Sequence, residues 1–119
     1  MADPSYLDLL KQGKEAWNSW RTQHLRVSPD LKEAKLSSWH LDRFDLSGAI
    51  LMQADLHEAD LQEAQCIATN LQEANLRGTN LAGTVLVAAR LQEADLTAAN
   101  LRGGYSQTRQ FTGSLFKEG

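Results

Sequence analysis

The residue types best suited to chemistry in this chain of 119 residues are three histidines, one cysteine and a serine near the C-terminus. His24, His40 and His57 have no cysteine or second histidine at the spacing of a zinc site. Cys66 is the only cysteine, and without partners it fits a small buried hydrophobic residue better than a reactive thiol. Ser106 lacks a plausible base and an acid to orient that base. The sequence therefore predicts no metal site and no nucleophilic catalysis.

Acid–base chemistry would have to come from the densest acidic group, which is Asp55, Glu58, Asp60 and Glu63. A carboxylate pair catalyses a reaction only where a cleft holds both groups against a substrate. The chain also contains no phosphate-binding glycine loop, no dinucleotide-binding glycine motif and no H-E-x-x-H sequence. We expect no enzyme activity and no bound cofactor, with these carboxylates on a solvated surface.

The charge and the composition exclude two further classes of partner, nucleic acids and membranes. The net charge is −3 and the isoelectric point is about 5.5, and the lysines and arginines are scattered, so we expect no direct binding of nucleic acid. The N-terminal sequence MADPSYLDLL lacks the features of a signal peptide, and no segment has the roughly 20 apolar residues of a membrane-spanning helix. With one cysteine and no disulfide, we expect a cytoplasmic protein that does not bind membranes.

The elements that position these residues are set by a repeat of five residues. Leucine recurs at every fifth position from Leu31 to Leu101, with Cys66 in one slot and Phe111 and Phe116 near the end of the series. A small residue usually stands two positions before each leucine. A period of five fits neither a helix nor a strand, but it fits a chain that turns a corner after every quintet. Four corners close a coil of about 20 residues, and neighbouring coils then pair as short parallel β-bridges.

The repeating pattern A-(D/N)-L-x-x resembles that of the pentapeptide-repeat family. It is clear in Ala54-Asp55-Leu56-His57-Glu58 and in Ala74-Asn75-Leu76-Arg77-Gly78, and the register holds over residues 29–118. The resemblance implies an all-β solenoid, the right-handed quadrilateral β-helix, with about four and a half coils and a short N-terminal α-helical cap. The segment from Leu10 to Arg21 is similar to the start of many bacterial, especially cyanobacterial, members. That likeness carries no assigned activity.

We divide the chain into a helical capping segment, residues 1–28, and a β-helix, residues 29–119, within one structural domain. Asp3 and Pro4 are typical of a helix start. Gly13 either permits a close approach to the coils or divides the segment into two helices. An apolar stripe at helical spacing is predicted to cover the first coil, against Trp39 and Phe44. The stripe consists of Leu7, Leu10, Trp17, Trp20 and His24.

The repeat weakens toward the C-terminus, where Arg109 stands in a small-residue slot. An arginine is not buried unpaired inside a coil, so we expect the last coil to be open or distorted. Phe111 and Phe116 are large enough to plug that end. They are the candidate contacts for end-to-end pairing with a second copy, unless the chain is a piece of a longer protein.

One face of the predicted coil differs from the other three, which are polar. Its outward positions include Ile67, Val85, Val87 and Tyr105. A contiguous apolar patch usually marks an interface, so these four residues are the candidate interaction face. Two alternatives remain: β-branched residues also suit β-bridge positions, and cover by the N-terminal segment would also account for the apolar residues.

Two functions are therefore compared. The first is a non-catalytic structural module that binds a protein partner of unknown identity through a face or an end, with a homodimer as one form of this. The alternative, which the family resemblance implies, is a DNA mimic that modulates DNA gyrase or topoisomerase. Residues 29–119 carry a modest excess of acidic side chains on a short rod, so mimicry is less well supported.

Overall fold

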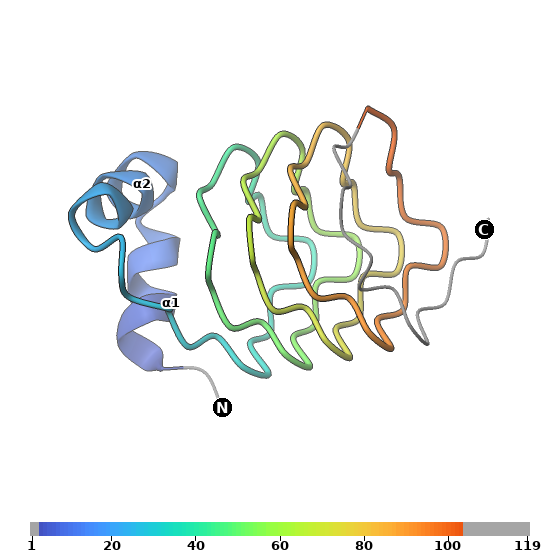
Figure 1. Ribbon diagram of the computed structural model, residues 1–119, viewed down its shortest axis with the longest axis horizontal. Helices are drawn as coiled ribbons and strands as arrows, with labels where there is room; N and C mark the ends of the chain where they lie inside the picture. Colours follow the sequence, from blue (N-terminus) through green and yellow to red (C-terminus); the bar gives the residue numbers. More distant parts are fainter. Residues whose placement is uncertain (1–2, 104–119) are drawn as a thin grey trace.

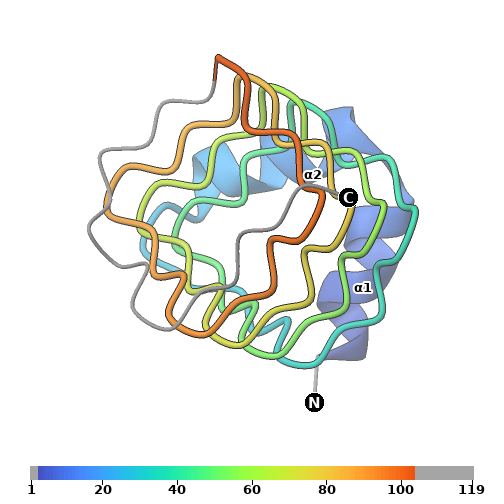
Figure 2. The same cartoon turned by 90° about the vertical axis from the view of Figure 1, so that its right-hand side faces the viewer.

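The computed structural model describes residues 3–103 of the chain. Two helices stand at the N-terminal end of a stack of flattened coils, as Figure 1 shows. They are α1, Pro4–Lys11, and α2, Lys14–Gln23. Viewed along the stack, successive coils superpose with a roughly four-sided outline, and the helices lie behind them (Figure 2). The protein is therefore a β-helix. The predicted number of coils depends on residues 104–119, which lie outside the described part.

Each coil pairs with the next through isolated parallel β-bridges between residues 20 apart, from Asp30 with Ile50 to Asn80 with Asn100. The Leu31 N–H donates to the Ile50 carbonyl at 2.8 Å, and the Ile50 N–H donates back to the Pro29 carbonyl at 2.9 Å. The same pattern recurs along the described coils. This geometry agrees with the coil of 20 residues that the leucine spacing predicts.

Each corner is a turn whose third residue has a positive φ. In the turn that begins at Leu51, the Ala54 N–H donates to the Leu51 carbonyl at 3.1 Å, and Gln53 has φ 59°. A positive φ favours glycine, yet glutamate, arginine, serine and alanine also occupy this position, as at Glu73 with φ 59°. Closure of the coil therefore imposes a backbone conformation that the local residue would not choose.

The interior is filled by the leucines and the small residues of the repeat. Leu41, Leu61 and Leu81 are at most 1% exposed, and Cys66 takes its predicted leucine slot at 1% exposure. Burying one such leucine contributes roughly 1.5–3 kcal/mol. The stacked leucines supply the main apolar stabilisation of the coils.

Aspartate and asparagine before the leucine are structural, as the sequence predicts. In each case the side-chain Oδ1 accepts a hydrogen bond from the N–H two residues on, as from Gln62 to Asp60 at 3.0 Å and from Ala82 to Asn80 at 3.1 Å. The Asn100 amide also donates to Asn80 one coil away at 3.3 Å. These short side chains satisfy backbone donors at the turns.

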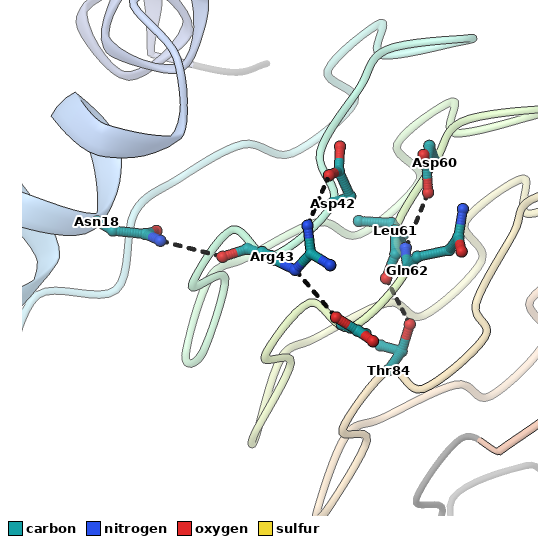
Figure 3. A network of polar contacts seen from close by, with 8 residues as sticks. Asn18, Asp42, Arg43, Asp60, Leu61, Gln62 and Thr84 are labelled. Atoms are coloured by element: carbon teal, nitrogen blue, oxygen red, sulfur yellow. Dashed lines mark hydrogen bonds and ion pairs between the residues drawn. The ribbon is translucent and has the colours of Figure 1, made fainter.

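Threonine in the small-residue slot adds a bond between coils. The buried hydroxyls of Thr69, Thr79 and Thr84 donate to the carbonyls of Leu46, Leu56 and Leu61 at 2.6–2.7 Å. Figure 3 shows the pair formed by Thr84 and Leu61. An alanine in the same slot fills the space without this hydrogen bond.

Asp3 begins α1, and its side chain accepts the Ser5 N–H at 2.9 Å. The chain divides at Gly13, which has φ 103°, so the segment forms two helices. Of the predicted stripe, Leu10 and Trp17 are buried, whereas Leu7, Trp20 and His24 are partly exposed. The Tyr6 ring packs edge-on against Trp20, with centroids 5.5 Å apart, and joins the two helices.

Three side chains of α2 bind the first coil. Trp17 is fully buried, and its indole N–H donates to the Asp45 carbonyl at 2.7 Å. Asn18 donates to the Arg43 carbonyl at 3.0 Å, a contact visible in Figure 3. Arg21 is 4% exposed, and its guanidinium donates to the carbonyls of Val27 and Ser47 at 2.8 and 2.6 Å. A buried cation therefore ties the helix, the turn that follows it and the coil together.

We expect Thr84→Val to lower the free energy of unfolding by about 1 kcal/mol, because the variant keeps the buried shape but loses the bond to Leu61. Leu61 still accepts the Ala64 N–H, which keeps the loss small. Urea unfolding followed by circular dichroism measures the change. Thr79→Val, which loses the equivalent bond to Leu56, should lose a similar amount, and unchanged stability of both variants would contradict the role of the buried hydroxyls.

Candidate interaction faces

The twenty-residue coil sorts the outward side chains onto four faces. The first, second and third faces contain the outward residues of the quintets that begin at residues 30, 35 and 40, and of the quintets 20, 40 and 60 positions later. The fourth, which we call the flat face, consists in the described part of Asp45, Ser47, Gly48, Gln65, Ile67, Ala68, Val85, Val87 and Ala88. Tyr105, predicted for the same face, lies outside the described residues.

The flat face carries a single charged side chain, Asp45, among the residues that define it. Charged residues are common on the other three faces: Asp30, Lys32, Glu33, Glu73, Arg90 and Glu93 on the first; Lys35, Asp55, Glu58, Arg77 and Asp95 on the second; Asp42, Arg43, Asp60, Glu63 and Arg102 on the third. The contrast in charge thus distinguishes the flat face from the rest of the coil surface.

The apolar side chains of the flat face lie on adjacent coils. Ile67 is 43% exposed, and Val85 and Val87 are half-buried. Gln65 forms a bridge with Val85, and the Ala68 N–H donates to the Val87 carbonyl at 2.9 Å, so Ile67 stacks beside Val87. The structure thus brings the three described candidates together. Gly48, Ala68 and Ala88 follow Ser47, Ile67 and Val87 directly in the sequence. The small size of these three residues leaves this part of the face without large protrusions.

The structure adds Leu25 to this region, a residue that the repeat did not indicate. Leu25 is 74% exposed and lies in the turn after α2. Arg21 bonds the Val27 carbonyl of this turn and the Ser47 carbonyl of the flat face, so the turn borders the face. Leu25 precedes the first paired coil, where the leucine register gives no signal. Ile67 stays 43% exposed, while Arg21 of the N-terminal segment lies against Ser47 and Gly48 of the same face.

The four acidic residues of the densest group are divided between two faces. Asp55 and Glu58 lie on the second face, and Asp60 and Glu63 lie on the third. Glu63 forms an ion pair with Arg43 of the preceding coil at 2.9 Å. The four carboxylates thus do not gather on a single face.

One polar pair was missed by sequence analysis. His57 Nδ1 lies 2.6 Å from Asp55 Oδ1, because the second residue after the aspartate folds back over it at the turn. Burial works to raise the pKa of Asp55, but hydrogen bonds from the side chain and backbone of His57, with the charge of His57, outweigh burial and lower that pKa. The aspartate therefore orients the histidine ring.

The His57 ring borders a groove of about 380 Å³ on the second face. Arg77 and Thr97 also line the groove, and both are bound to Asp95: the Arg77 guanidinium at 3.2 Å and the Thr97 hydroxyl at 2.6 Å. The hydrogen bond from Thr97, opposed by burial and assisted by Arg77, lowers the pKa of Asp95. Among the described lining residues, no serine, cysteine or lysine stands as a nucleophile beside His57.

Cys66 is buried among the leucines. Burial raises the pKa of its thiol to about 12, so the thiolate needed for nucleophilic attack or metal binding is not formed near neutral pH. Within residues 3–103, no three acidic, histidine or cysteine side chains converge on a metal position. The same part of the chain includes no helix with the length and apolarity to span a bilayer.

Comparison with known proteins agrees with the repeat. The family described as pentapeptide repeats matches residues 30–64 and 64–103, with 8 copies. The crystal structure of Rfr23, a pentapeptide repeat protein from the cyanobacterium Cyanothece 51142, is 34% identical with a TM-score of 0.60. The match covers 78% of this chain and 64% of Rfr23, so the chain spans less than two thirds of that protein.

A second structural neighbour shares the fold. The protein alr5209 from Nostoc PCC 7120, also a pentapeptide repeat protein, has a TM-score of 0.52 at 24% identity. The match covers 83% of this chain and 93% of alr5209. No protein with a curated description matches the sequence.

We expect Asp55→Asn to reduce stability at neutral pH and to have a smaller effect at pH 3. The lowered pKa means that ionised Asp55 stabilises the folded state above its unfolded pKa, and that this contribution disappears as pH falls through the folded pKa. Urea unfolding of both proteins at pH 7 and pH 3 tests this. His57→Gln should reproduce the loss at neutral pH, whereas a difference that grows in acid would refute the pairing.

Proposed function

Because the chain belongs to the pentapeptide-repeat family, we propose that it is a non-catalytic interaction module that binds another protein through the flat face. One observation carries the proposal: a surface with a single charge covers part of a coil whose other faces are densely charged. Protein interfaces are depleted in charged residues at their centre, since each buried charge must be desolvated. Ile67 and the neighbouring valines supply the apolar centre, and the charged faces around it keep the rest of the rod in water.

The shape of the flat face supports the same proposal. Ala68 and Ala88 carry small, exposed side chains, so an extended or flat partner surface can approach closely. Leu25 is a further exposed apolar side chain in the turn that borders the face. The exposed fractions of Ile67 and Leu25, 43% and 74%, leave apolar area for a partner to cover.

We predict that Ile67→Glu weakens capture of the native partner, or self-association, about tenfold or more. The substitution places a charge at the centre of the buried area and leaves the coil interior intact. Binding is measured by quantitative pull-down from the source cells and by sedimentation velocity. Val87→Glu should act in the same way.

Gln62→Glu is the matched control, because Gln62 is exposed and occupies the same position of its quintet on the third face. It should bind like the unaltered protein. Circular dichroism of all variants should be unchanged. If Ile67→Glu and Val87→Glu both bind and assemble normally, the flat face is structural and the proposed function is wrong.

We further propose that residues 1–28 cap a β-helix formed by residues 29–119 and keep its apolar end from water. Three contacts of α2 support this: the indole of Trp17, the amide of Asn18 and the guanidinium of Arg21 all bond to carbonyls of the first coil. The capping contacts replace the backbone donors that a preceding coil would provide.

Arg21→Lys tests the cap. We expect a loss of about 1.5–3 kcal/mol in the free energy of unfolding, because a single ammonium group does not span the carbonyls of Val27 and Ser47. Chemical denaturation measures the loss. Arg26→Lys, exposed in the adjoining turn, should change stability by less than about 0.5 kcal/mol. Equal stability of the two variants would contradict the capping role.

A further inference from the structure

Two hollows lie between α1 and the first coil, separated by one tryptophan. One has a volume of about 430 Å³ and is floored by Leu10, Trp39 and Phe44. The other, of about 400 Å³, is floored by Leu7, Ala34 and Trp39. Trp39 and Lys11 line both. The two hollows are therefore neighbours on either side of Trp39, and together we call them the Trp39 groove.

The groove exists because Trp39 breaks the repeat. It stands in the slot that later coils fill with Ala59 and Thr79, both of which are buried. The first coil has no coil before it, so a large ring in this slot lies in the space beneath α1, where it is half-buried. An indole with one part covered and one part accessible is a common anchor at protein interfaces.

The rim of the groove is basic in a protein whose coils are acidic. Lys11, Lys14 and Lys35 line it, beside the carboxylates of Glu33 and Asp42. In contrast, the charged residues between positions 46 and 100 are Asp55, Glu58, Asp60, Glu63, Glu73, Arg77, Arg90, Glu93 and Asp95. The lining of the groove therefore carries three lysines and two carboxylates, whereas the charged residues between positions 46 and 100 are mostly acidic.

We propose that the Trp39 groove binds an acidic peptide segment of a partner protein. Two apolar side chains of that segment, about one helical turn apart, enter the hollows on either side of Trp39, and flanking carboxylates pair with Lys11, Lys14 and Lys35. The volumes suit one large side chain each, and an apolar floor with a few charged groups at the edge is the usual form of a peptide-binding groove. The residues beyond position 103 carry Arg109, Lys117 and Glu118, so this chain's own tail has the wrong charge for the site.

The Trp39 groove is separate from the flat face. An experiment can therefore contradict the groove proposal without contradicting the proposed function of the flat face, and the reverse is also true. The groove is formed by α1 and by the quintets that begin at residues 30, 35 and 40, whereas the flat face is formed by those that begin at 45, 65 and 85. A substitution on one surface should leave binding at the other unchanged.

The test uses three fluorescein-labelled peptides of twelve residues and the full chain. The first has phenylalanine and leucine four positions apart among glutamates, the second has lysine in place of glutamate, and the third has alanine in place of both apolar residues. Fluorescence anisotropy should detect binding of the first peptide, weakened tenfold or more by 0.5 M salt, because exposed ion pairs are screened. The second and third peptides should bind at least tenfold more weakly.

Trp39→Ala should weaken binding of the first peptide about tenfold or more. The variant is expected to fold, since alanine is the normal residue in this slot. Lys11→Glu, on the exposed surface of α1, should have a similar effect without touching the interior, and provides the same test if Trp39→Ala is unstable. Ile67→Glu is the control and should bind like the unaltered chain.

Several results would overturn the proposal. These are no binding of the first peptide at millimolar concentration, equal binding of the lysine peptide, or equal binding by the Lys11→Glu variant. Displacement of the first peptide by N-acetylphenylalanine at an equal concentration would show a site for a small aromatic carboxylate instead.

Discussion

The structure depends on backbone hydrogen bonding between residues 20 positions apart. The Leu31 and Ile50 amides bond across neighbouring coils in both directions, and every described coil repeats the arrangement. This pairing has no tolerance for a change of register, because a shift of one residue would turn leucine outward and a charged side chain inward. It explains why the apolar residues are so uniform and why the outward positions are so varied. The two inward positions of each quintet require leucine and a small residue, whereas the outward positions tolerate almost any side chain.

The regular part of the fold was predictable from the sequence, and the irregular contacts were not. The leucine spacing gives the coil and the face of each residue, including the buried slot of Cys66 and the apolar row at Ile67 and Val87. The five-residue spacing does not predict the role of Arg21. Its guanidinium binds one carbonyl in the following turn and another in a coil, 26 residues away. The spacing also does not predict the contact between His57 and Asp55, because that contact depends on the side-chain rotamer of His57 at the corner. The repeat predicts which slot and which face each residue occupies, but these contacts depend on where its side chain points.

Charge is distributed unevenly over the rod, and this shapes what each surface can bind. Some carboxylates are paired across coils, as in Arg43 with Glu63 and Arg77 with Asp95. Such exposed pairs contribute little to stability, with a median of about 0–1 kcal/mol, but they moderate repulsion between stacked acidic rows. The flat face avoids charge, while the Trp39 groove carries lysines. A partner that touched both regions would meet an apolar surface on one side and a basic one on another, which favours one orientation of docking.

The positive φ of the third residue in each turn affects which substitutions the surface tolerates. Every third residue of a turn, from Glu33 to Gly103, has a positive φ whatever its side chain, because coil closure fixes that conformation. Exchange between glutamate and alanine at such a corner leaves the backbone strain as it was, whereas replacing a corner glycine such as Gly83 adds strain of roughly 1–2 kcal/mol. Lineages of this architecture can drift at their corners while the leucine stacks stay fixed. New outward side chains are then accessible through single substitutions at the corners that already carry a side chain.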